Sequence, residues 1–108
     1  MKSKIIAIDL AKDVFEVAVA NEHHQILERH RLTRKAFSAF LAAQPPALVL
    51  FEACGTAHFW GRTAQALGHQ LRLLPAQYTA PYRRRGKTDR ADTEALLEAH
   101  RCDDIKPV

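Results

Sequence analysis

The segment from Ala47 to Ala53, ALVLFEA, is apolar at every position except Glu52. A strand with one face in water alternates polar and apolar side chains, whereas a strand covered on both faces is almost continuously apolar. The diproline Pro45-Pro46 ends the segment that precedes this run. The run therefore predicts a central strand whose sheet is covered by other elements on both faces.

The rest of the chain supplies further strands and helices in an order that fits such a sheet. The apolar groups IIAI and VFEVAVA, between Lys4 and Ala20, favour a pleated surface and predict a hairpin broken at AKD. The remaining expected elements are a strand over Gln25–Leu32, a helix from its Thr33 cap to about Ala43, a helix from about Ala57 to Leu67 closed by Gly68, a strand over QLRLL, a loop over Ala76–Lys87 and a helix over Thr88–Arg101. This order predicts an α/β fold of the RNase H-like type, with a mixed five-stranded sheet flanked by helices.

Composition limits the organisation of the chain and its partners. With 108 residues and 47% hydrophobic residues, residues 1–108 are expected to form one domain with its own core. A formal net charge of +4 favours a polyanionic partner. Cys54 and Cys102 lack the spacing of a disulfide framework or a zinc finger. Charged residues interrupt the N-terminal apolar run, so we expect a cytoplasmic protein without a signal peptide or membrane span.

Two acidic residues stand at the ends of predicted buried strands. Asp9 follows the apolar group IIAI, and Glu52 ends the apolar run of the central strand. An isolated buried carboxylate costs several kcal/mol, so each needs a cation or hydrogen-bond donors. Ligands collect at the ends of neighbouring strands in α/β sheets, so the two acids are expected to converge on one site. The alternatives are that Asp9 only opens a turn and that Glu52 caps the next helix.

Two further acids lie three residues apart on the predicted last helix. Asp89 and Asp92 are about 60° apart on the helical surface, and Leu96 falls between them. Glu94 and Glu98 fall on the opposite side. We therefore expect the aspartates to meet the sheet and the glutamates to face water. The alternative, that acids in a first turn complement the helix dipole, explains Asp89 better than Asp92.

These four acids predict a divalent-metal site beside a basic segment. Carboxylate oxygens without a histidine constellation suit Mg²⁺ or Mn²⁺ rather than zinc. The residues expected to contact a nucleic acid come just before the last helix, and they are Arg83, Arg84, Arg85 and Lys87, with Tyr82 and Tyr78 available for sugar or base contacts. The alternative is an ordinary solvated basic loop.

Three sequence blocks together resemble a known family. They are IAIDLAKDVFEVAV, LFEACGTAHFW and LRLLPAQYTAPYRRRGKTDRADTEAL, which span nearly the whole chain in the family's order. The chain resembles the N-terminal domain of the insertion-sequence one-ten family of transposases. The resemblance implies a RuvC-like domain with a DEDD set of catalytic metal ligands, which by motif position are Asp9, Glu52, Asp89 and Asp92.

The same resemblance implies an activity and partners. Members carry out Mg²⁺-dependent DNA cleavage and strand exchange during transposition, guided by a structured bridge RNA, and assemble the active site between subunits. They also carry a C-terminal domain with a serine nucleophile, which is absent from this sequence, so the chain alone is expected to be incomplete. In a cell, a protein of this family is expected to be associated with the nucleoid. The alternative readings are a stand-alone junction-resolving nuclease and a basic nucleic-acid-binding module whose acids are structural. A sugar-kinase or actin-like domain is disfavoured because the glycine-rich phosphate loops are missing.

Overall fold

The computed structural model describes residues 4–10, 13–79 and 89–101, and it leaves the side chains of 76, 78 and 89–92 undescribed. Its strands are β1 (Ile5–Asp9), β2 (Val14–Ala20), β3 (Ile26–Thr33), β4 (Leu48–Glu52) and β5 (Gln70–Leu74). Its helices are α1 (Arg34–Ala43), α2 (Gly55–Ala66), α3 (Ala76–Thr79) and α4 (Asp89–Arg101). No helix of the described residues is long and apolar enough to cross a membrane.

The five strands form one mixed sheet in the order β3-β2-β1-β4-β5. Strands β1, β2 and β3 pair antiparallel, whereas β1 pairs parallel to β4 and β4 pairs parallel to β5. Residues Val49, Leu50 and Phe51 of β4 are fully buried, which confirms that this run is an interior strand. The predicted α/β class and the mixed five-stranded sheet are thus confirmed.

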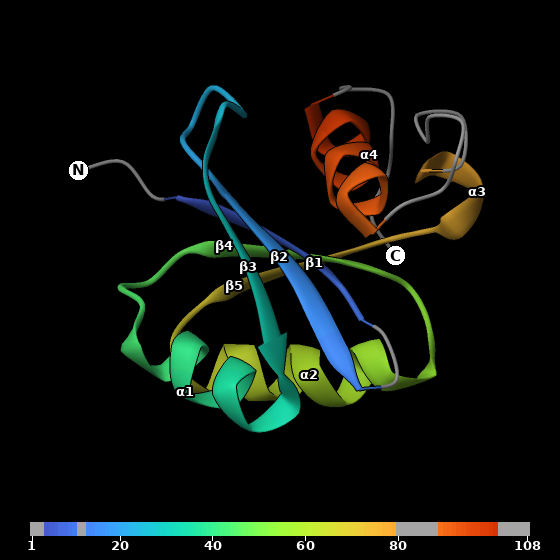
Figure 1. Ribbon diagram of the computed structural model, residues 1–108. Coiled ribbons are helices and arrows are strands. Elements are labelled where there is room, and N and C mark those ends of the chain that lie inside the picture. The colour runs from blue at the N-terminus through green and yellow to red at the C-terminus, as the bar shows by residue number, and fades with distance from the viewer. Residues whose placement is uncertain (1–3, 11–12, 80–88, 102–108) are drawn as a thin grey trace.

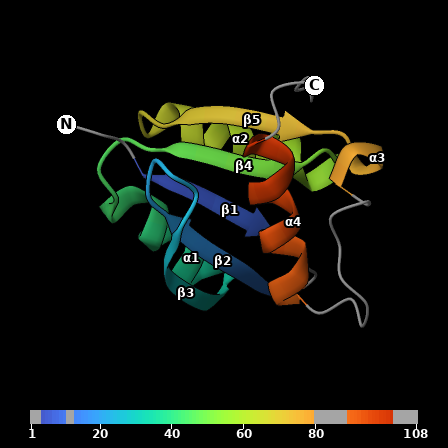
Figure 2. The ribbon, with the colours of Figure 1, turned by 90° about the horizontal axis from the view of Figure 1, so that it is seen from above.

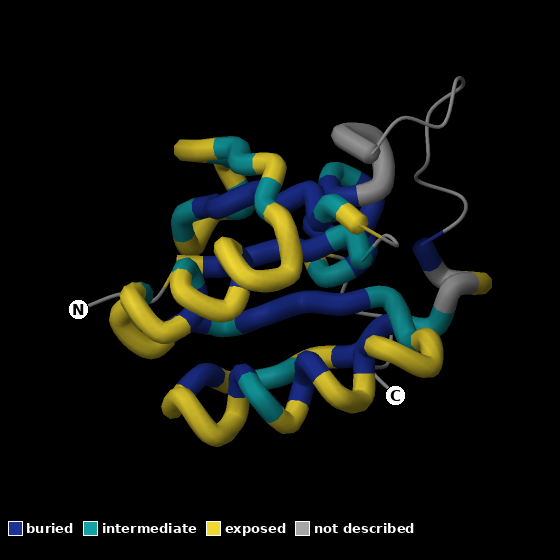
Figure 3. The backbone as a smooth tube through the Cα atoms, turned by 60° about the horizontal axis from the view of Figure 1, so that its bottom comes forward, coloured by how far each residue is buried: buried dark blue, intermediate teal, exposed yellow. Residues whose placement is uncertain are grey.

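Helices cover both faces of the sheet. Helices α1 and α2 lie together on one face, and α4 crosses the other (Figure 1). Viewed from above, α4 lies over β1 and its neighbours, with α3 beside it at the end of β5 (Figure 2). The middle strands are buried along most of their length, while the helices alternate between buried and exposed residues (Figure 3). This alternation is the pattern of helices that turn one side to a core.

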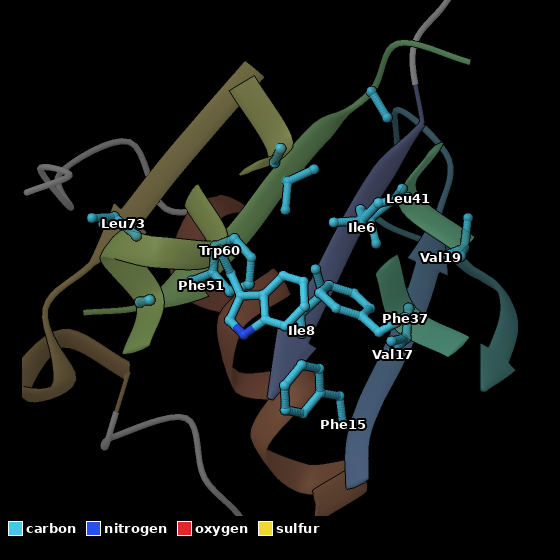
Figure 4. Packing of buried hydrophobic residues seen from close by; sticks show 14 residues of the cluster. Ile6, Ile8, Phe15, Val17, Val19, Phe37, Leu41, Phe51, Trp60 and Leu73 are labelled. Atoms are coloured by element: carbon cyan, nitrogen blue, oxygen red, sulfur yellow. The ribbon is translucent and has the colours of Figure 1, made fainter. Parts of the chain in front are cut away.

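The face under α1 and α2 carries the larger core. Ile6 and Ile8 of β1 point into it, alongside three aromatic side chains from three different elements (Figure 4). Phe15, Phe37 and Trp60 contact one another edge-to-face, with ring centroids 5.0 to 5.4 Å apart. Edge-to-face contacts of this kind add to the stabilisation from burial alone. This cluster fixes α1 and α2 against the sheet.

The face under α4 is built from smaller side chains. Ala7, Ala18 and Ala20 are all fully buried there, and their small size lets the helix approach the strands closely. From α4, Leu96 and Leu97 pack into this layer. The position of α4 over the sheet is therefore set by alanines on the strands and leucines on the helix.

The structure confirms most of the helix ends predicted from the sequence. Thr33 caps α1 as predicted, since its side-chain oxygen accepts a hydrogen bond from the Ala36 amide at 3.2 Å. Helix α2 begins at Gly55 rather than near Ala57, and Gly68 closes it with a φ of 94°, a left-handed conformation that favours glycine. The loop expected over 76–87 is wrong for 76–79, which form the short helix α3. Residues 80–88 lie outside the described residues.

Candidate metal centre

Asp9 and Glu52 end two neighbouring parallel strands. The register of β1 and β4 pairs Ile8 with Phe51, so the next residue on each strand is one of the two acids. Adjacent strands lie about 4.8 Å apart, which sets the two acids side by side at the carboxyl edge of the sheet. Both residues are half-buried. The structure thus brings this predicted pair together.

Both acids belong to the face of the sheet that α4 covers. Successive side chains on a strand point to opposite faces. Ala7 on β1 and Leu50 on β4 pack in the core beneath α4, and each lies two residues before an acid. Asp9 and Glu52 therefore project toward α4 rather than toward α1 and α2.

A buried threonine holds the Glu52 carboxylate. The Thr79 hydroxyl, at the end of α3, donates a hydrogen bond to Glu52 Oε2 at 2.5 Å, and Thr79 is fully buried. This contact fixes the direction of the carboxylate from outside its own strand. Thr79 was not among the predicted site residues, because its segment was expected to be a loop. Glu52 does not occupy the cap position of α2, which is Cys54, so the helix-cap alternative for Glu52 is wrong.

Asp89 and Asp92 form part of the first turns of α4, and their side chains lie outside the described residues. The helix itself behaves as expected on one side, since Leu96 and Ala99 are buried against the sheet and Ala95 is fully buried. Asp92 precedes Leu96 by four residues, about one helical turn. The predicted inward placement of the two aspartates stays a prediction.

One of the two glutamates expected to face water has a structural partner. Glu94 accepts a hydrogen bond from the Arg29 guanidinium at 2.7 Å, and the same guanidinium lies 3.4 Å from the buried Thr93 hydroxyl. Glu94 is half-buried, so the expectation of a purely solvent-facing acid is wrong for it. Glu98 pairs with Arg101 three residues later on the exposed side of the helix. Arg29 therefore ties β3 to α4.

A third acid on the strands was not singled out from the sequence. Glu16 lies directly opposite Asp9 in the β1–β2 register and is 9% exposed. Its Oε2 has no hydrogen-bond partner among the described residues, and Arg31 Nε is 3.6 Å away. The signal available was the single charge inside VFEVAVA, where alternation places it on the same face as Ala18.

The described acids have the oxygen donors that a hard divalent cation prefers, but they are too few to form a full metal site. Among the described residues no group of three His, Cys, Asp or Glu side chains could hold a metal ion. Asp9 and Glu52 nevertheless supply carboxylate oxygens, the donor type that suits Mg²⁺ or Mn²⁺, and Glu16 adds a third negative charge opposite Asp9. A full site needs further ligands.

The basic residues predicted to contact a nucleic acid precede α4 in the sequence. Arg83, Arg84, Arg85, Lys87 and Tyr82 all lie outside the described residues. The expected basic surface beside α4 therefore stays a prediction.

A histidine pair joins the far end of α4 to the β2–β3 hairpin. His24 Nε2 and His100 Nδ1 are 2.9 Å apart. Burial lowers the pKa of both rings below the ordinary histidine value, and nearby Arg101 lowers the pKa of His24 further. These histidines lie apart from the carboxyl edge and hold the helix to the hairpin in their neutral forms.

The fold and the paired acids define an α/β domain with a candidate metal centre at the carboxyl edge of its sheet. The chain is 43% identical over 94 residues to a "Probable family 20 transposase" of Pseudomonas aeruginosa, covering 87% of this chain and 28% of that protein. It is 39% identical to the transposase for insertion sequence element IS1328 of Yersinia enterocolitica, covering 88% and 28%. It is 34% identical to the transposase for insertion sequence element IS1111A of Coxiella burnetii, covering 89% and 26%.

The chain is therefore a homologue of insertion-sequence transposases over most of its length, which confirms the resemblance predicted from its motifs. It spans about a quarter of the length of these curated relatives. No family model matches the chain. No solved structure matches it either.

Proposed function

We propose that this chain forms the metal-binding catalytic domain of an insertion-sequence DNA transposase, and that its fold is of the RNase H-like, RuvC-like type. The observation that carries the proposal is the placement of Asp9 and Glu52 side by side at the carboxyl edge of the sheet, on the face crossed by α4. Homology to insertion-sequence transposases supports the same assignment. Asp89 and Asp92, at the start of α4, complete the proposed DEDD set.

The residues of the proposed centre have distinct roles. Asp9 and Glu52 supply carboxylate oxygens from rigid strands, and Thr79 holds Glu52 in one direction. A bound Mg²⁺ or Mn²⁺ ion would activate a nucleophile and neutralise charge on a phosphodiester. In this proposal Asp89 and Asp92 would face the strand acids, because Leu96, Leu97 and Ala99 of the same helix pack against the sheet. The domain's substrate in this proposal is DNA.

The proposed partners follow from the same assignment. Arg83, Arg84, Arg85 and Lys87 precede α4 in sequence, so they would bind the phosphate backbone next to the acids. A structured bridge RNA that guides the choice of DNA, assembly of the full-length protein into a homo-oligomer and association with the nucleoid are further parts of the proposal. DNA cleavage and strand exchange would need the remainder of a full-length transposase.

Metal titration tests the proposed centre. We expect Mg²⁺ or Mn²⁺ to raise the melting temperature of the 108-residue chain, because an ion that binds only the folded state stabilises it. Asp89→Asn and Asp92→Asn should each reduce that response. Glu28→Gln is the matched control, since Glu28 is an exposed acid on β3. The proposed ligand set is wrong if both aspartate variants respond to metal as the unmodified chain does.

A second function is favoured by one observation, namely the formal net charge of +4 together with the basic residues Arg83, Arg84, Arg85 and Lys87. In this alternative the chain is a basic nucleic-acid-binding module and its acids are structural. It predicts salt-sensitive binding to DNA or RNA that survives loss of all four acids and falls when Arg83 to Arg85 are neutralised. Binding assays on both sets of variants separate the two functions. Metal-dependent cleavage of branched DNA by this chain alone would instead support a junction-resolving nuclease.

A further inference from the structure

Four charged residues form one row across the sheet on the face covered by α4. Arg31 on β3 pairs with Glu16 on β2, and Glu16 pairs with Asp9 on β1. Glu52 follows on β4, one residue beyond the pairing of Ile8 with Phe51. Side chains directly opposite on neighbouring strands lie about 4.5 to 5.5 Å apart at Cβ. Three acids therefore stand next to one another, with a single arginine at the end of the row.

This arrangement is unfavourable unless a cation compensates it. Like charges directly opposite each other on neighbouring strands are destabilising. Asp9 and Glu16 are such a pair, and Glu16 is 9% exposed, so water screens it poorly. A buried carboxylate oxygen without a donor carries a desolvation cost. The Glu16 carboxylate therefore needs a nearby cation or hydrogen-bond donor, and the described residues meet this need only in part.

Arg31 compensates the charge of Glu16 only in part. Its Nε lies 3.6 Å from Glu16 Oε2, beyond hydrogen-bond distance, and the Arg31 side chain is 67% exposed. By contrast, Glu94 accepts a direct hydrogen bond from Arg29 at 2.7 Å, and Glu98 accepts two from Arg101. The most buried of these paired acids therefore has the weakest partner. A buried ion pair offsets its desolvation cost only when its geometry is good, so a purely structural role for Glu16 would require a closer partner than Arg31.

We propose that Glu16 is a positioning residue for the candidate metal centre, where it accepts hydrogen bonds from water molecules in the hydration shell of a divalent cation held by Asp9 and Glu52. This inference rests on the proposed function. Magnesium keeps several water ligands when it binds to proteins, and those waters need acceptors that hold them in place. Glu16 lies opposite Asp9 in the strand register, and its buried Oε2 has no hydrogen-bond partner among the described residues. It acts from outside the ligand set because no three described acids could hold a metal.

The test compares Glu16→Gln with Arg31→Met in the 108-residue chain. Gln keeps the shape of the side chain and removes its charge, and Met keeps the bulk of Arg31 while removing the ion pair. The readouts are Mn²⁺ affinity by electron paramagnetic resonance and the melting temperature in a chelator. Neither readout depends on activity. Glu28→Gln is the control for a simple change of net charge, because Glu28 is exposed.

We expect Glu16→Gln to weaken Mn²⁺ binding about 10-fold or more, as loss of an outer-sphere partner typically does. Its melting temperature in chelator should not fall, because one of two opposed acids becomes neutral. Arg31→Met should keep or strengthen Mn²⁺ binding. The proposal is overturned if Glu16→Gln binds Mn²⁺ like the unmodified chain. It is equally overturned if both variants lower the melting temperature alike without changing affinity, since Glu16 would then serve only as the partner of Arg31.

The result also separates this inference from the proposed function. If the unmodified chain binds no Mn²⁺, or if Asp9→Asn leaves its affinity unchanged, then the proposed metal centre is wrong and this inference fails with it. If Asp9→Asn abolishes binding while Glu16→Gln and Glu28→Gln both bind normally, the centre stands and only the role of Glu16 is refuted.

Discussion

The Thr79 hydroxyl donates a hydrogen bond of 2.5 Å to the Glu52 carboxylate and so connects the short helix α3 to the end of β4. Thr79 is fully buried, and Glu52 is half-buried. A hydrogen bond to a charged group contributes more to stability than one between neutral groups. The contact therefore fixes one of the candidate metal ligands through an element distant in sequence.

Replacing Thr79 should expose the strength of this contact. Thr79→Val keeps the side-chain shape and removes the donor, so we expect a loss of about 1.5 to 3 kcal/mol in the free energy of unfolding. Urea denaturation measures it. In a Glu52→Gln background the same substitution should cost less, because the charged acceptor is gone. Equal losses in both backgrounds would show that the hydroxyl does not act through the Glu52 charge.

The aromatic cluster under α1 and α2 should dominate the stability of the fold. Phe37→Ala removes a fully buried ring that contacts Phe15 and Trp60, and we expect it to cost about 3 to 5 kcal/mol. Phe59→Ala is the matched control, because Phe59 touches Trp60 but is 55% exposed, and its loss should be about 1 kcal/mol or less. Chemical denaturation of both variants checks the difference. Similar losses would contradict the assigned core.

The salt bridge between β3 and α4 should be worth more than the one within α4. We expect Glu94→Gln to destabilise the chain by about 1 kcal/mol, since Glu94 accepts a hydrogen bond from a largely buried Arg29. Glu98→Gln should cost under about 0.5 kcal/mol, because both partners of its pair with Arg101 are about half exposed. Thermal or urea unfolding of the two variants tests this order. The reverse order would remove the assigned role of Arg29 in holding α4.

The histidine pair predicts a loss of stability in mild acid. The folded-state pKa of both His24 and His100 is lowered, chiefly by burial, so the unfolded chain binds protons more readily near pH 6.5. Stability from this pair is thus complete above about pH 6.5 and falls as the pH drops below it. The charged neighbours are Arg101, Glu98 and His23 around His24, and Arg72 near His100, with Glu98 opposing the lowering.

Melting temperatures measured between pH 7.5 and 5 test this dependence. His100→Asn should flatten the curve below about pH 6.5, because one of the two rings that resist protonation is gone. His23→Asn serves as the control, since His23 is exposed at the tip of the same hairpin. If the control flattens the curve as much as His100→Asn does, the dependence does not originate in the pair.

Local patterns in the sequence were sufficient for most elements of the fold. The apolar run at 47–53 determined an interior strand, because only a strand covered on both faces can be apolar throughout. Thr33 determined the start of α1 through its own hydroxyl. Asp9 and Glu52 were selectable as candidate ligands for the same local reason, since an acid within an apolar strand needs a partner. Their motif positions also revealed the homology to insertion-sequence transposases.

Only the tertiary structure decided which residues meet. The parallel pairing of β1 with β4 sets Asp9 beside Glu52, and the antiparallel register of β1 with β2 sets Glu16 opposite Asp9. The contacts of Thr79 with Glu52 and of Arg29 with Glu94 join residues that are 27 and 65 positions apart. No local pattern encodes such contacts, because strand register and helix docking are settled by packing across the whole core. The sequence named the acids at the edge of the sheet, and the packing of the sheet and α4 decided their neighbours.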